Sequence, residues 1–169
     1  EITYEYLQST ALAKFKKVER IIPPKEMPLV QIAGPAGNLV TLPNKEQYML
    51  INIWSVKCKE CIFDLERLNR LQKILNNYGN RWRIVAASID ASQDLKKVTN
   101  LIKKYNLTSI AEYYDVKGDL KKVIAPQHLP ATIIVSNKGY ILYKTYGNAP
   151  WLDQNIISFL RAMPLAKNK

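Results

Sequence analysis

The sequence predicts an α/β fold in which a central mixed β-sheet has helices on both faces. Short, almost wholly apolar segments at 49–54, 82–89 and 132–135 have the composition of strands that are buried on both faces. Segments in which apolar residues recur at helical spacing, 59–77 and 93–105, alternate with these strands. Because consecutive parallel strands need a crossover connection, this alternation predicts parallel pairs joined by helices.

The N-terminal stretch has its own pattern. Apolar residues recur at helical spacing through residues 1–22, and Pro23-Pro24 follow them, so we predict one amphipathic helix that ends there. We interpret residues 1–24 as an N-terminal extension and residues 25–169 as the main domain. Two roles for this helix remain open. It either packs on the domain as a spacer, or lies at a membrane interface below an anchor.

The remaining elements follow in chain order. Residues 29–32 and 39–42 are expected to form a hairpin that turns at Gly37-Asn38, and residues 49–54 form a central strand. The others expected are a helix at 59–77, strands at 82–89 and 111–114, helices at 93–105 and 119–124, strands at 132–135 and 140–143, and a closing helix at 151–163. The last two strands should add an antiparallel hairpin at an edge of the sheet. Ser92 or Asp90 is expected to cap the helix at 93–105.

The charge of the chain bears on its partners. With 25 basic and 14 acidic residues in 169, the net charge is +11. The lysines are scattered in pairs, with no Arg-rich cluster and no interleaved aromatic residues, which favours a solvated surface over a nucleic-acid site. Attraction to acidic partners or lipid headgroups is the alternative. The sequence has no apolar run long enough to span a bilayer.

The chemistry-bearing feature is the pair Cys58 and Cys61, the only cysteines of the chain, placed between a strand and a helix. The thiolate is the attacking form in disulfide exchange, and Cys58 would stand at the helix N-terminus, where backbone N–H groups stabilise an anion. Lys57 and Lys59 should lower its pKa further, whereas Glu60 acts in the opposite direction. Cys61, one helical turn on, would be the buried resolving thiol.

The two thiols have other possible uses. A structural zinc site usually needs four ligands, and the chain offers two cysteines and one histidine, so a zinc finger is excluded within one chain. A Cu(I) site made by the thiolates with His128 remains an alternative, although His128 also fits a surface loop. Two small buried core residues are the third possibility. We expect no metal and no cofactor other than the Cys58–Cys61 disulfide.

The segment Ile51-Asn52-Ile53-Trp54-Ser55-Val56-Lys57-Cys58-Lys59-Glu60-Cys61 resembles the active-site segment of thioredoxin-like proteins, in particular the TlpA/ResA/CcmG branch. A second match, Leu129-Pro130-Ala131-Thr132-Ile133-Ile134-Val135 with Asn137-Lys138-Gly139-Tyr140-Ile141, has the family's order and spacing. The likeness covers about residues 27–162. It implies a thioredoxin-like fold and a thiol–disulfide oxidoreductase.

The resemblance also implies a setting. Members of this branch reduce protein disulfides outside the cytoplasm, often from a membrane tether, and serve cytochrome c or copper-site assembly. The expectation is therefore a periplasmic or other extracytoplasmic monomer, with a tether upstream of residue 1, that acts on disulfide- or thiol-bearing proteins. A disulfide oxidase and a scaffold that only docks through its basic surface are the alternatives.

Residue roles follow from the same likeness. Pro130 corresponds to the family's cis-proline beside the thiols, so the backbone of Leu129 would pair with an extended substrate. Trp54 would contribute to the floor of the site.

The chain departs from the family pattern at several positions. Lys57 and Glu60 replace the usual aromatic residue and proline of the motif, and Glu66 replaces a second proline. Asn52 stands where thioredoxin has a buried aspartate, and it cannot exchange a proton at neutral pH. Glu60 and Asp64 are the candidates to take that task.

Overall fold

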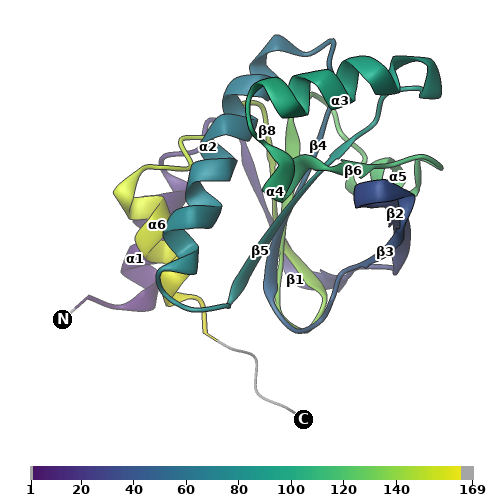
Figure 1. The fold of residues 1–169 in the computed structure, drawn as a ribbon. Coiled ribbons are helices and arrows are strands. Elements are labelled where there is room, and N and C mark those ends of the chain that lie inside the picture. Colours follow the sequence, from purple (N-terminus) through teal and green to yellow (C-terminus); the bar gives the residue numbers. More distant parts are fainter. Residues whose placement is uncertain (1, 165–169) are drawn as a thin grey trace.

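The computed structural model describes residues 2–164 of the chain, which form one mixed sheet with helices on both faces (Figure 1). The strands are β1 (Val18–Glu26), β2 (Val30–Ala33), β3 (Leu39–Leu42), β4 (Tyr48–Trp54), β5 (Trp82–Ser88), β6 (Tyr113–Tyr114), β7 (Ala131–Val135) and β8 (Tyr140–Tyr146). The helices are α1 (Tyr4–Leu12), α2 (Lys59–Asn76), α3 (Leu95–Lys104), α4 (Thr108–Ala111), α5 (Asp119–Ile124) and α6 (Gln154–Ala162).

The strand order is β1-β8-β7-β4-β5-β6-β2-β3. β4 pairs with β5 and β5 with β6 in parallel, whereas the remaining neighbours are antiparallel, so the predicted mixed sheet is confirmed. The hairpin of β2 and β3 is confirmed too, with Val30 opposite Leu42. Every residue of β4 is buried, as its apolar sequence predicted for a central strand.

The sheet separates two hydrophobic cores, since side chains alternate between the faces of a strand. Leu50 and Trp54 of β4 pack on one face with residues from α1, α2, α3, α4 and α6. Met49, Ile51 and Ile53 pack on the other face with β2 and α5. Figure 1 shows α1, α2 and α6 together on the first face and α5 beside β2 and β3, away from them.

The N-terminal prediction was partly wrong. The helix ends at Leu12, and residues expected to extend it to 22 begin β1, which pairs with β8 through Val18–Thr145. Pro23-Pro24 lie within β1, at an edge of the sheet, where a missing backbone N–H is tolerated. Because β1 covers β8, the hairpin of β7 and β8 is not at the sheet edge, and the boundary we placed after residue 24 falls inside a strand.

Two helix starts also differ from the prediction. α3 begins at Leu95 after a 3₁₀ turn, and neither Asp90 nor Ser92 caps it, the N-cap residue being Asp94. Leu95, the first residue of α3, lies on the surface. α6 begins at Gln154, where the Asp153 side chain accepts a hydrogen bond from the Asn155 N–H, a stronger start signal than the apolar pattern from 151.

Candidate active site

The two cysteines meet where β4 passes into α2. Cys58 is the N-cap residue of α2, and its sulfur accepts a hydrogen bond from the Cys61 N–H at 3.2 Å. The two residues form a disulfide, with their Cα atoms 5.4 Å apart. Cys61 is completely buried, whereas Cys58 is partly exposed. A partner can therefore reach the first sulfur and not the second.

The loop before Cys58 is held by a residue that sequence reasoning misassigned. Asp90, just after β5, accepts hydrogen bonds from the Ser55 hydroxyl at 2.7 Å and the Val56 N–H at 3.1 Å. It also accepts one from the Ser88 hydroxyl at 2.7 Å. The only signal available in sequence was an acid following the strand that runs parallel to β4. Asp90 thus fixes the entry of the chain into the thiol pair.

A second carboxylate lies on the inner side of the pair. Asp64 is completely buried one helical turn after Cys61, and it accepts hydrogen bonds from the Ala149 N–H at 3.1 Å and the Trp151 indole N–H at 3.0 Å. Burial raises the pKa of Asp64 from 3.8 to about 7, although these two hydrogen bonds and the charge of Arg67 act in the lowering direction. Its carboxyl group can therefore gain or lose a proton near neutral pH.

The strand carrying the second predicted motif adjoins this carboxylate. The Asn52 side-chain amide donates to Thr132 Oγ1 at 3.0 Å and to Asp64 at 3.4 Å, which links β4, β7 and α2. The Leu129–Pro130 bond is cis, and the Pro130 carbonyl accepts from the Gly147 N–H at 2.7 Å.

The tryptophan predicted as the floor of the site is buried in the hydrophobic core. Trp54 and Cys61 lie in one core cluster, against which Cys58 and Leu129 pack. Trp54 is therefore a core residue on the same face of the sheet as the thiol pair, and its role as the floor of the site stays a prediction.

The charged residues of the motif lie at the surface. Lys57 places its amine 3.9 Å from the Asp94 carboxylate, with its own side chain 80% exposed, and Lys59 is an exposed first residue of α2. Glu60 lies 3.4 Å from His128 Nε2, so the histidine reaches the rim of the thiol helix. Within residues 2–164 no group of three or more His, Cys, Asp or Glu side chains is placed to hold a metal ion.

Comparison with solved structures agrees with this geometry. A protein assigned as the thiol:disulfide interchange protein DsbE of Chlorobium tepidum matches with a TM-score of 0.69 at 18% identity, over 85% of this chain and 99% of that one. StoA of Bacillus subtilis matches with a TM-score of 0.66 at 20% identity, over 80% and 99%. The thioredoxin domain of a thiol-disulfide oxidoreductase from Bacteroides vulgatus gives 0.63 at 20%, over 80% and 93%. At these identities the matches show a shared fold.

The family itself is shown by a sequence-family model. The model described as thioredoxin-like matches residues 46–141, more than half of the chain, and this range includes both cysteines and Pro130. The chain therefore belongs to the thioredoxin-like family, and it carries the bonded cysteine pair of a thiol–disulfide oxidoreductase.

Proposed function

We propose that this thiol–disulfide oxidoreductase reduces disulfides in partner proteins outside the cytoplasm. The observation that carries the proposal is the asymmetry of the bonded pair, in which Cys58 is partly exposed at a helix N-terminus and Cys61 is fully buried behind it. This arrangement supports Cys58 as the nucleophile and Cys61 as the resolving thiol. The reduced dithiol supplies two electrons as the disulfide between the two cysteines forms.

The reaction begins from the reduced pair. The Cys58 thiolate attacks one sulfur of the partner disulfide, so a mixed disulfide forms and the other partner sulfur leaves as a thiolate. Cys61 then loses its proton and attacks the Cys58 sulfur, which releases the second partner thiolate. The partner gains two electrons, and the protein is left with the Cys58–Cys61 bond seen in the structure.

Asp64 is the group that we assign to receive the Cys61 proton. It is buried on the same helix face three residues later, and its pKa of about 7 permits proton exchange at neutral pH. Glu60, the other candidate, lies at the surface beside His128, whereas Cys61 is fully buried. Asn52 has no acid–base role here, but its amide donates to Asp64.

The backbone before Pro130 is proposed to bind the substrate. Leu129 packs against both cores, one of which contains Cys61, and this position supports its backbone as a pairing edge for an extended peptide. Trp54, which is fully buried, is proposed to form the floor beneath the pair. Lys57, Lys59 and Glu60 are proposed to tune the pKa of the Cys58 thiol, through charge next to the helix N-terminus.

The cellular setting is part of the proposal. The likeness to the TlpA/ResA/CcmG branch supports a periplasmic or other extracytoplasmic location, with substrates in cytochrome c or copper-site assembly. The chain would act as a monomer, tethered upstream of residue 1. Within the part of the chain that the structure describes, no helix has the length and hydropathy to cross a membrane. Fractionation of cells that express the full-length gene product tests both the location and the tether.

Catalysis is tested by insulin reduction with an external reductant. We expect the wild-type protein to accelerate it and Cys58→Ser to abolish the acceleration. Cys61→Ser should accumulate a mixed disulfide with the substrate, detected by mass spectrometry, because the resolving thiol is missing. Wild-type turnover in Cys58→Ser would refute the assignment of the nucleophile.

The direction of electron flow has its own measurement. Equilibration of the pair with glutathione gives its reduction potential, and a value near or below about −230 mV, in the range of thioredoxin and the glutaredoxins, fits a reductant. A value near about −120 mV, as for a strong protein oxidant, would instead make the protein a disulfide oxidase.

A further inference from the structure

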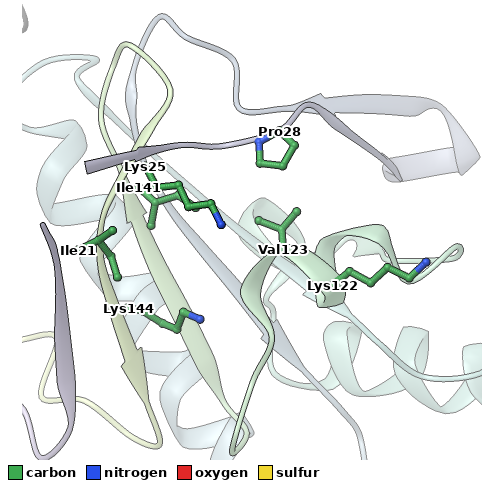
Figure 2. Close-up of a pocket in the computed structure, with 7 residues that line it drawn as sticks. All are labelled: Ile21, Lys25, Pro28, Lys122, Val123, Ile141 and Lys144. Carbon is green, nitrogen blue, oxygen red and sulfur yellow. The ribbon is translucent and has the colours of Figure 1, made fainter. Parts of the chain in front are cut away.

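A cleft lies on the sheet face opposite the thiol pair, and none of its lining residues takes part in the proposed disulfide exchange. β1 pairs with β8 through Arg20–Tyr143 and next through Lys25–Ile141, so residues 21–24 arch away from a single intervening residue of β8. α5 packs on the same face of the sheet. The space between the arch, β8 and α5 is a cleft of about 450 Å³, within the range of small-molecule sites (Figure 2).

The walls of the cleft combine two kinds of side chain. Ile21, Val123 and Ile141 supply an apolar surface, and Lys25, Lys122 and Lys144 supply three amines, with no acidic residue in the lining. Figure 2 shows the amines of Lys25 and Lys144 projecting into the space between β8 and α5, whereas the Lys122 amine points away from them. The cleft therefore has an apolar wall beside two amines that project into the same space.

Lys144 is the anchored member of this set. Its side chain is half-buried, and its amine donates to the Ile124 carbonyl at 2.6 Å, at the end of α5. Glu19 lies opposite Lys144 across the strand pair, yet the amine turns to the neutral carbonyl instead. Within residues 2–164 none of the three amines has a carboxylate oxygen within 4.0 Å.

We propose that this cleft binds a small amphiphilic anion, with an aliphatic body against Ile21, Val123 and Ile141 and a carboxylate or phosphate head between Lys25 and Lys144. The Lys144 ammonium is partly desolvated, and its contacts are the neutral Ile124 carbonyl and the face of the Tyr146 ring, 5.8 Å away. It therefore gains from an anionic partner, since charged hydrogen bonds are stronger than neutral ones. The apolar wall selects for a ligand with a hydrocarbon body over a bare anion. The cleft contains neither cysteine, so the binding proposal stands or falls separately from the proposed reductase activity.

Titration followed by amide NMR shifts of the ¹⁵N-labelled protein tests the site. The probes are octanoate and octyl phosphate, with octanol and acetate as the body alone and the head alone. We expect saturable shifts at the cleft residues for the two amphiphilic anions, and affinities weaker by about tenfold or more for octanol and acetate. The same shifts should occur in Cys58→Ser.

Matched variants distinguish the effect of the cleft lysines on binding from the effect of the protein's overall positive charge. Lys25→Met with Lys144→Met should lower octanoate affinity by about tenfold or more. Lys121→Met removes a charge from the same helix outside the cleft and should leave the affinity unchanged. The proposal is overturned by equal loss in Lys121→Met, by octanol binding as well as octanoate, or by no saturable shift in a folded protein. Binding of anionic phosphatidylglycerol vesicles through these lysines, without octanoate binding, would assign them to a membrane surface and overturn it also.

Discussion

Two carboxylates near the thiol pair, Asp64 on α2 and Asp90 after β5, are held in opposite ways. Asp64 is fully buried, and its hydrogen bonds from Ala149 and Trp151 do not offset the cost of removing its charge from water. Asp90 lies at a strand end and receives hydrogen bonds from the loop that leads into Cys58. Asp64 can therefore exchange a proton near neutral pH, whereas Asp90 fixes the backbone of the loop before Cys58.

The largest expected effect is on the pH dependence of stability. The folded-state pKa of Asp64 is about 7 against 3.8 for the ordinary group, so between these values the folded protein holds a proton that the unfolded chain has lost. Its contribution to stability is complete below pH 3.8 and is lost as pH rises through about 7. Since one pKa unit is about 1.4 kcal/mol, the loss is at most about 4 kcal/mol.

Asp64→Asn removes this titration and keeps an oxygen acceptor for Trp151 and Ala149. We expect its free energy of unfolding, relative to wild type, to rise between pH 4 and pH 8 in urea titrations of the oxidised proteins. Glu66→Gln, on the same helix but only partly buried, is the control that should follow the wild-type profile. Parallel profiles for Asp64→Asn and wild type would place its pKa near the ordinary value.

The second effect is on the resolving step. If Asp64 accepts the Cys61 proton, Asp64→Asn should slow release of the partner from the mixed disulfide about a hundredfold, the lower range for a lost general base. The wild-type rate should rise with pH through about 7, and this inflection should be missing from the variant. Rapid-quench measurement with a glutathione mixed disulfide at Cys58 follows the step directly. An unchanged inflection would show that another group takes the proton.

The third effect concerns the loop. Asp90→Ala leaves the Val56 N–H and the Ser55 and Ser88 hydroxyls without their acceptor, so we expect a loss of about 1–2 kcal/mol in unfolding free energy. Insulin reduction should fall moderately, while the pH inflection of the resolving step remains. Asp90→Asn should recover part of the stability because one acceptor oxygen is kept. Asp94→Ala, whose contacts are 3.9 Å pairs with exposed lysines, should change little.

The contrast also marks what sequence patterns can predict. The apolar run of β4, the helical spacing of α2 and the cysteines between them are local signals, and the structure has all three where they were expected. The environment of Asp64 depends on Trp151, 87 residues away, and that of Asp90 on Ser55, 35 residues away. From the sequence, Asp64 was only one of two candidate proton acceptors, and Asp90 was wrongly predicted to cap a helix. Both predictions were limited because burial and hydrogen bonding depend on these distant partners.

The helix prediction for residues 18–22, which form the start of β1, was wrong for a related reason. The spacing of Val18 and Ile22 fits a helix, and only pairing with β8, more than a hundred residues later, makes the segment a strand. Long-range pairing leaves no periodic trace in a nine-residue stretch that is mostly exposed. The cleft between the arch of β1 and α5 could not be expected for the same reason.

The smallest expected effect is that of the exposed lysine before Cys58. Lys57 is 80% exposed and shares its amine with Asp94 at 3.9 Å, so water and salt screen its field at the Cys58 sulfur. Lys57→Gln should therefore raise the pKa of the Cys58 thiol by less than about half a unit, and less still at high salt. The pH dependence of alkylation of the reduced protein by iodoacetamide measures it, with Lys73→Gln at the far end of α2 as the control. A rise of more than about one unit, near 1.4 kcal/mol, would mean that the rim charge acts on the thiolate as strongly as a buried group.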